Sequence, residues 1–158
     1  MKFEKFIKRA GKHVLTLTDT ERNKWACNGR VMMIIPDGVN FTGTPTATIP
    51  EWLTDEIYSC DPVEYEDEQA FLDRAELPAY GKAKDIERIY KLGRDEIRVN
   101  NADWSLIESS DITTIICDND GETIALVIYN RHGDVEGVIF AEDFNIYAKI
   151  EEENNNVN

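Results

Sequence analysis

The sequence predicts an α+β fold in which short helices pack largely on one face of an antiparallel sheet. The main observation is the stretch 112–140, ITTIICDNDGETIALVIYNRHGDVEGVIF, which holds three runs rich in β-branched residues. The runs are separated by residues 118–121 and 130–134, whose Asn, Asp and Gly residues favour tight turns. Helix patterns at residues 3–12 and after Thr48 supply the α part. The stretch 112–140 therefore predicts a three-stranded antiparallel meander.

Length and composition favour one domain over residues 1–150, with halves at 1–80 and 81–150. The chain has 158 residues, of which 42% are hydrophobic, enough to bury a core. The longest apolar run, residues 31–36, is too short to cross a membrane, and the N-terminus lacks the apolar core of a signal peptide. We therefore expect a cytoplasmic protein with no membrane contact. Residues 151–158, EEENNNVN, are too polar to bury and predict a disordered tail.

Residues 3–12 predict a short amphipathic helix that ends near Gly11. Phe3, Phe6 and Ile7 recur at helical spacing and form its apolar side. The rest of its surface is basic, and its candidate contact residues for phosphate or an acidic partner are Lys5, Lys8, Arg9 and Lys12. A solvated basic face is the plainer interpretation of the same residues.

Two strands are predicted next, over residues 14–18 and 31–35. Between them, residues 19–30 predict a connection of uncertain form. Residues 41–48 predict either an edge strand or a loop. The sequence TIPE at residues 48–51 has the capping-box arrangement and predicts that a helix follows.

The segment from Asp55 to Glu76 is strongly acidic and predicts a lightly packed surface. The candidate acidic partner surface within it consists of Asp61, Glu64, Glu66, Asp67 and Glu68. Acidic clusters can bind divalent cations, but these residues lack the fixed spacing of a metal-binding loop. We therefore predict no metal site here.

The C-terminal half predicts a strand over residues 86–92 and a second strand over 96–99, joined by a turn. Asn100 or Asn101 can cap a short helix that leads into the meander. Residues 144–150 predict a last short strand.

The sequence predicts no catalytic residue and no cofactor. It contains no GxGxxG, P-loop, GxSxG or HExxH motif, and its two histidines lack partners at a useful spacing. The turn Asp118–Glu122 resembles an EF-hand loop, but placing Gly121 at the sixth position puts Ile116 and Val127 at ligand positions, so the calcium interpretation fails. The three cysteines are widely spaced, which favours buried inert thiols over a disulfide framework.

Charge is distributed unevenly along the chain. Eight basic and three acidic residues give residues 1–30 a net charge of +5, and the net charge of −14 then leaves −19 for the remainder. An acidic body repels nucleic acid at long range, while a basic N-terminus can contact phosphate locally. Trp25, with Lys24, Arg22 and Arg30 nearby, is the tryptophan that we predict to make a surface contact.

The order of elements over residues 86–144 resembles the repeat of DNA sliding clamps. Strand, helix and three strands form a βαβββ unit, and IRVNNADWSLIESS and DVEGVIFAEDF look like a strand that leads into a helix and a closing strand of that repeat. In clamps, helices line the inner surface of a ring and strands form its outside. Residues 1–85 show no second copy of the unit in the same order.

Three functional hypotheses follow. The first is a non-enzymatic, clamp-like accessory or scaffold in DNA replication or repair, which self-associates through sheet edges and contacts DNA through its basic N-terminal face. The second is an acidic protein-interaction module, of phage or mobile-element origin, that binds a basic partner or mimics DNA. The third is an enzyme whose site is assembled from dispersed residues.

Overall fold

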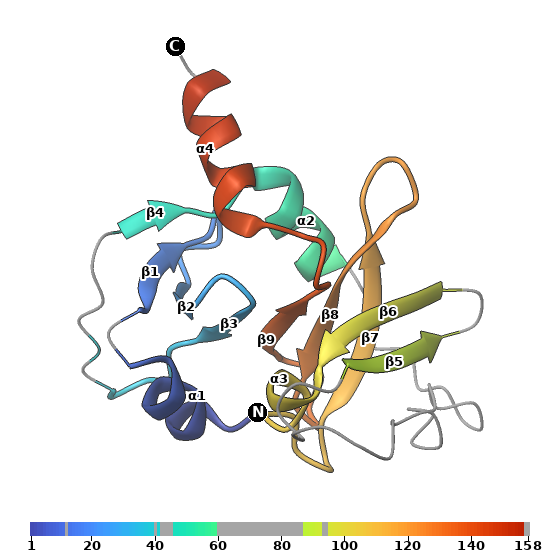
Figure 1. The fold of residues 1–158 in the computed structure, drawn as a ribbon. Helices are drawn as coiled ribbons and strands as arrows, with labels where there is room; N and C mark the ends of the chain where they lie inside the picture. The colour runs from blue at the N-terminus through green and yellow to red at the C-terminus, as the bar shows by residue number, and fades with distance from the viewer. Residues whose placement is uncertain (12, 40, 42–45, 60–86, 93–94, 157–158) are drawn as a thin grey trace.

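The computed structural model describes residues 1–11, 13–39, 41, 46–59, 87–92 and 95–156 (Figure 1). The helices are α1 (Phe3–Ala10), α2 (Glu51–Ser59), α3 (Asn101–Trp104) and α4 (Ile146–Asn156). The strands of the N-terminal part are β1 (Leu15–Thr18), β2 (Lys24–Cys27), β3 (Val31–Ile34) and β4 (Thr46–Thr48). The remaining strands are β5 (Glu87–Leu92), β6 (Asp95–Asn100), β7 (Ile112–Cys117), β8 (Thr123–Tyr129) and β9 (Val135–Phe140). These elements confirm the predicted α+β class.

Seven of the strands form one sheet in the order β4-β1-β2-β3-β9-β8-β7. All neighbouring strands in it run antiparallel except β1 and β4, which are parallel, so the sheet is mixed and not purely antiparallel as predicted. Strands β3 and β9 join the N-terminal and C-terminal halves, with Met32 opposite Val138. The hairpin β5–β6 forms a separate sheet beside β7 and β8 (Figure 1).

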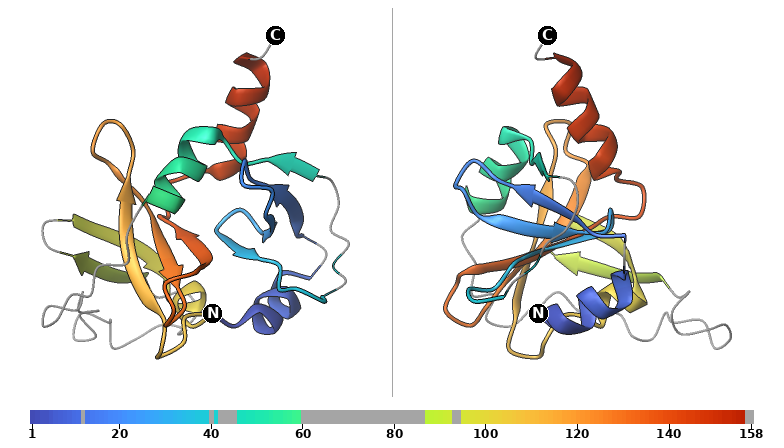
Figure 2. Two further views of the ribbon diagram at one scale, coloured as in Figure 1. Left: turned by 180° about the vertical axis from the view of Figure 1, so that it is seen from behind. Right: turned by 90° about the vertical axis from the view of Figure 1, so that its left-hand side faces the viewer.

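The helices are divided between the two faces of the sheet instead of gathering largely on one (Figures 1 and 2). Helix α1 and the segment that follows α3 cover one face, where Phe6 and Leu106 pack with Leu126 of β8. Helices α2 and α4 cover the other face, where Leu53 and Ile146 belong to the second cluster. The physical reason is that β8 is apolar on both sides: from Ala125 to Tyr129, successive side chains enter opposite clusters, so both faces must be shielded from water.

The local predictions for the meander, for the β5–β6 hairpin and for the α3 cap are confirmed. The meander occupies Ile112–Phe140 as predicted, and the β5–β6 hairpin precedes it. The side chain of Asn100 caps α3, with its Oδ1 accepting the Ala102 N–H at 2.7 Å. Residues 19–30, predicted as a connection, contain strand β2.

The predicted strand over residues 144–150 is wrong, because helix α4 begins at Ile146. The Asn145 side chain accepts the N–H groups of Tyr147 at 3.1 Å and Ala148 at 3.2 Å, which is the bonding of an N-cap. The predicted disordered tail, 151–158, continues this helix up to Asn156, with residues 151–155 exposed.

The main sheet contains the same arrangement twice, a helix followed by three antiparallel strands. The first copy is α1-β1-β2-β3 and the second is α3-β7-β8-β9. Because the last strands of the two copies pair antiparallel, the topology is pseudo-twofold about the β3–β9 pair. The strand that opens a βαβββ unit is present as β6 before α3, while the part of the chain described before α1 contains no counterpart. The helix and the three strands of the unit are thus present in both halves of the described chain.

Replacing Gly137 by alanine should lower the free energy of unfolding by about 1–3 kcal/mol. Gly137 lies opposite Met33 in the β3–β9 pair, and a Cβ there would stand 3.1 Å from the Met32 carbonyl oxygen and would overlap the Met1 sulfur. The sulfur can move, but the carbonyl belongs to the strand that joins the two halves. Urea unfolding followed by circular dichroism measures the effect, and an unchanged midpoint would contradict this close packing.

Candidate nucleic-acid interface

Helices α1 and α3 lie side by side on one face of the sheet (Figures 1 and 2). The Lys2 N–H donates to the Leu106 carbonyl at 2.9 Å, which ties the start of α1 to the chain just beyond α3. Phe6 is fully buried beneath α1, so the apolar side of the helix faces the sheet as the sequence predicts. Lys2, Lys5 and Arg9 then fall on the flank of α1 that faces α3. We call the boundary between the two helices the α1–α3 seam.

The lysines of the seam converge on Ser105, the residue that ends α3. The Lys2 ammonium donates to the Ser105 carbonyl oxygen at 3.2 Å, and the Lys5 ammonium donates to Ser105 Oγ at 3.1 Å. Carbonyl groups at a helix C-terminus carry negative partial charge and attract cations. The end of α3 therefore attracts Lys2, which precedes α1, and Lys5 of α1 to the same exposed surface.

A buried carboxylate, Asp103, binds the two arginines of the seam, Arg9 and Arg30. Its exposed fraction is only 2%, and its Oδ1 accepts a 2.8 Å hydrogen bond from Arg9 Nη2 and a 3.3 Å hydrogen bond from Arg30 Nη2. Arg30 Nε lies 3.3 Å from Asp103 Oδ2. Burial raises the pKa of the Asp103 carboxyl, and the neighbouring charges of Arg30 and Arg9 offset only part of this effect.

The N-terminal ammonium is held at the start of α1 by three carboxylates. It lies 2.8 Å from Asp111 and 3.4 Å from Glu108, and it also pairs with Glu136 of β9. Burial lowers the pKa of this ammonium, but the hydrogen bonds and charges of Asp111 and Glu136 outweigh burial, so its pKa is raised. These ion pairs fix α1 against both the meander and the segment after α3.

The structure brings only some of the predicted contact residues together. Lys5 and Arg9 lie in the seam, while Lys8 is exposed elsewhere on α1. Lys12 lies outside the described residues, as do the acidic candidates Asp61, Glu64, Glu66, Asp67 and Glu68. Sequence reasoning missed Asp103 and Arg30. The spacing of Lys2, Lys5 and Arg9 along one helix flank is the signal that could have revealed the rest of the seam.

The prediction of a surface contact by Trp25 is wrong, because this side chain is fully buried. It packs in the cluster beneath α2 and α4, and its Nε1–H donates to Asp19 Oδ2 at 2.8 Å. Asp19 also accepts the Tyr58 hydroxyl at 2.7 Å and the Asn23 N–H at 2.9 Å. Burial and the bond to Asp19 raise the pKa of Tyr58. Trp25 is therefore part of a buried network that connects the β1–β2 turn to α2.

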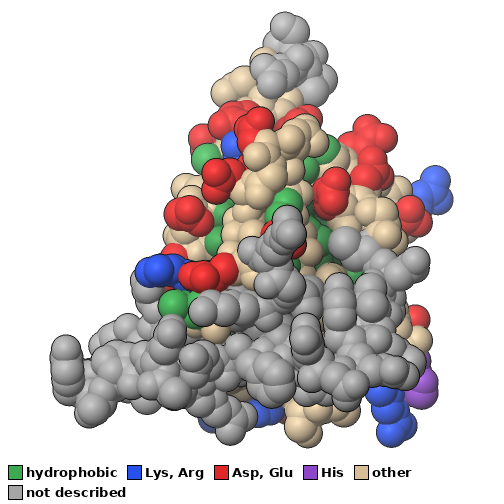
Figure 3. Space-filling model, turned by 90° about the vertical axis from the view of Figure 1, so that its right-hand side faces the viewer, with side chains coloured by type: hydrophobic (Ala, Val, Ile, Leu, Met, Phe, Trp, Pro, Cys, Tyr) green, Lys and Arg blue, Asp and Glu red, His purple; other side chains and the backbone are tan. Residues whose placement is uncertain are grey.

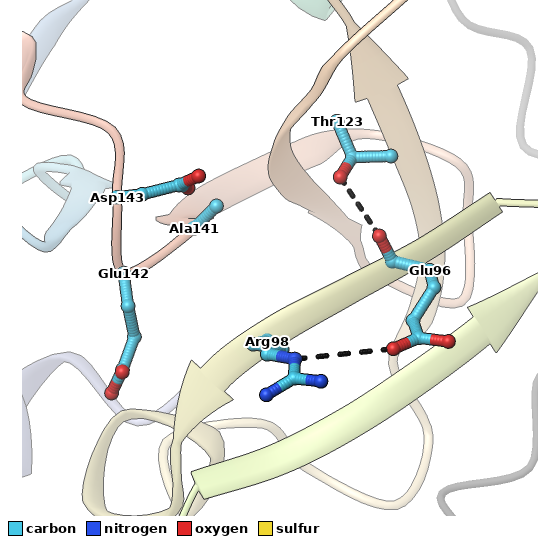
Figure 4. Close-up of a pocket in the computed structure, with 6 residues that line it drawn as sticks. All are labelled: Glu96, Arg98, Thr123, Ala141, Glu142 and Asp143. Atoms are coloured by element: carbon cyan, nitrogen blue, oxygen red, sulfur yellow. Dashed lines mark hydrogen bonds and ion pairs between the residues drawn. The ribbon is translucent and has the colours of Figure 1, made fainter.

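A shallow pocket of about 370 Å³ lies between β6 and the segment that follows β9 (Figure 4). Its lining includes Glu96, Arg98, Glu142 and Asp143. Thr123 donates to the Glu96 carbonyl at 2.8 Å, and Arg98 pairs with the Glu96 carboxylate at 3.9 Å. Acidic side chains are spread over the upper part of the face shown in Figure 3. Across the described residues, no group of three His, Cys, Asp or Glu side chains is placed to hold a metal ion.

Neither cysteine within the described residues forms a disulfide. Cys27 is fully buried and Cys117 is half-buried, while Cys60 lies outside the described residues. Burial raises the pKa of the Cys27 thiol to about 11, which keeps it protonated and unreactive at neutral pH.

Comparison of the chain with protein-family models, with curated proteins and with solved structures finds no match. Among the described residues, no helix has the length and apolar character needed to cross a bilayer.

Proposed function

We propose that this chain is a non-enzymatic, clamp-like DNA accessory that contacts the phosphate backbone through the α1–α3 seam. One observation carries the proposal: the helix-plus-three-strand arrangement occurs twice in one sheet, and its two helices lie side by side on one face. The resemblance to sliding clamps implies the same placement, with helices toward the DNA and strands away from it. The fold alone does not supply the function, so the chemistry of the seam has to support it.

The charge of the seam suits a sequence-independent contact with phosphates. Its cations are Lys2, Lys5, Arg9 and Arg30, and its main anion, Asp103, is buried and paired with both arginines. Lysine and arginine side chains on a protein surface release counterions from DNA, which gives affinity without reading the bases. Because the whole chain carries −14, attraction to DNA is local and sensitive to salt.

Self-association through sheet edges belongs to the same proposal. One chain of 158 residues offers a single α1–α3 seam among its described residues. Several copies joined edge to edge would present their seams to a common duplex, as the resemblance to clamp rings implies. Light scattering of the protein with and without duplex DNA measures this assembly.

Reversing Lys2 and Lys5, the two lysines of the seam, to glutamate in one variant should weaken duplex DNA binding by about tenfold or more at 0.1 M salt. Each phosphate contact contributes about −0.9 to the slope of log K against log salt, so the slope should fall by about two units. Fluorescence anisotropy with a labelled duplex at several salt concentrations measures both quantities. The matched control is Lys149→Glu on α4, which covers the opposite face of the sheet.

Equal binding at low and high salt would contradict the proposal, as would an equal loss in the Lys149→Glu control. If the wild-type chain retains no DNA but captures a basic protein, the acidic interaction module becomes the better hypothesis.

A further inference from the structure

The geometry points to a phosphate site in which Arg9 and Arg30 both donate to one phosphate group. Asp103 is the positioning residue that holds both guanidinium groups. The ligand class is a phosphodiester of a nucleic-acid backbone. This identification of the natural ligand rests on the proposed function, whereas the site itself rests on the contacts of the three side chains.

The two guanidinium groups meet on one carboxylate oxygen. Arg9 Nη2 and Arg30 Nη2 both donate to Asp103 Oδ1, at 2.8 and 3.3 Å. Their nitrogen atoms are therefore close enough for one phosphate group to accept from both. Asp103 is buried, so its carboxylate neutralises part of their mutual repulsion from within the protein while a ligand approaches from solvent.

Both arginines retain N–H donors for an anion. A guanidinium has five N–H donors. Arg9 uses Nη1 toward the Ala102 carbonyl and Nη2 toward Asp103, and Arg30 uses Nη2 and Nε toward Asp103. The Arg30 side chain is 59% exposed and that of Arg9 is 30% exposed. The planar donor fork of arginine matches phosphate oxygens, and pairing by two donors gives such contacts their direction.

The backbone of Arg30 is fixed from several sides. The Arg30 N–H donates to Asn28 Oδ1 at 3.0 Å, the Val31 N–H donates to the same oxygen at 2.9 Å, and the Arg30 carbonyl accepts the Phe140 N–H at 2.8 Å. Arg9 is fixed by α1 and by its contact with Asp103. Preformed donors lose less entropy on binding than flexible surface lysines do.

Both arginines come from the first copy of the repeated arrangement, and the carboxylate that they share comes from the second copy. Arg9 lies near the end of α1, Arg30 lies in the turn between β2 and β3, and Asp103 belongs to α3 of the second copy. The site therefore forms only when the two helices are docked against each other. This placement makes it part of the α1–α3 seam and not an isolated surface pair.

The first measurement titrates the wild-type chain with inorganic phosphate at low ionic strength and follows the Nε–H signals of its arginines by NMR. We expect saturable shifts of the Arg9 and Arg30 signals with one common dissociation constant. Arg22, exposed in the turn between β1 and β2, is the internal control and should show only a small, non-saturating shift. In Arg30→Gln the saturable shift of Arg9 should be lost, while Arg22→Gln should leave it unchanged. Equal shifts at Arg22, or an Arg9 shift that survives Arg30→Gln, would overturn the site.

The second measurement uses duplex DNA and separates this site from the proposed function. Arg9→Gln and Arg30→Gln should each weaken binding by about five- to tenfold at 0.1 M salt and lower the salt slope by about one. The double variant should lower the slope by about one and not by two, because both arginines hold the same phosphate. If the wild-type chain binds phosphate in this way but not DNA, the site stands and the proposed function fails. If DNA binds and Arg30→Gln and Arg22→Gln weaken it equally, the site fails and the proposed function stands.

Discussion

Replacing Trp25 by alanine should lower the free energy of unfolding by about 3–5 kcal/mol, the loss expected for truncating a buried tryptophan. The side chain is fully buried among the residues that α2 and α4 cover. Its removal leaves a cavity in the cluster and deprives the buried Asp19 carboxylate of the Nε1–H donor at 2.8 Å. Urea unfolding followed by far-ultraviolet circular dichroism measures the loss.

Two matched variants separate the contributions to this effect. Trp25→Phe keeps most of the buried ring but removes the bond to Asp19, so it should cost about 1–3 kcal/mol. Trp52→Ala removes a half-buried tryptophan from α2 and should cost less than Trp25→Ala. A larger loss for Trp52→Ala than for Trp25→Ala would show that Trp25 is not the anchor of this cluster.

Trp25 also shows why neighbouring residues in sequence are a poor guide to exposure. Lys24 and Arg22 suggested a basic surface, and both are exposed. Strand β2, however, turns successive side chains to opposite faces, and its pairing with β1 and β3 places Trp25 over the core. A strand of four residues inside a polar segment has too short a pattern for its alternation to be recognised. The burial of Trp25 depends on the two strands that pair with β2, which are β1 and β3.

Elements with strong local signals were predicted well. The meander depends on turns built by residues 118–121 and 130–134, and the α3 cap depends on one Asn side chain, so each is specified by residues close in sequence. The C-terminal helix had a local signal too. Asn145 provides the N-cap, but the apolar residues that follow it suggested a strand. The N-cap residue Asn145, considered together with the helical spacing of Ile146 and Ile150, would have predicted helix α4.

The α1–α3 seam could not be predicted from the sequence for a different reason. Arg9 and Asp103 are 94 positions apart, and Arg30 and Asp103 are 73 positions apart. Their contact depends on the β3–β9 pairing, which brings the two repeated arrangements together. Sequence patterns located the basic helix, but they could not specify which carboxylate would organise its arginines.

Replacing Asp103 by alanine should lower the free energy of unfolding by about 2 kcal/mol, because the hydrogen bonds of Arg9 and Arg30 to this charged acceptor are lost. Asp103→Asn keeps an acceptor oxygen and should cost less. Removing the negative charge of Asp103 should change the free energy of unfolding little. The free-energy cost of burying the carboxylate already exceeds the stabilisation by its ion pairs with the arginines.

The pH dependence of stability tests that last point directly. Since the pKa of Asp103 is raised above its ordinary value of 3.8, the folded chain binds a proton at this site more readily than the unfolded chain does. The stability contributed by this shift is fully present below pH 3.8 and is lost as the pH rises through the folded-state pKa. Asp103→Asn cannot titrate, so the wild-type stability minus that of the variant should decrease over this interval and then stay constant. Denaturant curves of both proteins between about pH 3 and 7 measure the difference. A difference that grows with pH would mean that the arginines outweigh burial and that the ionised carboxylate stabilises the seam.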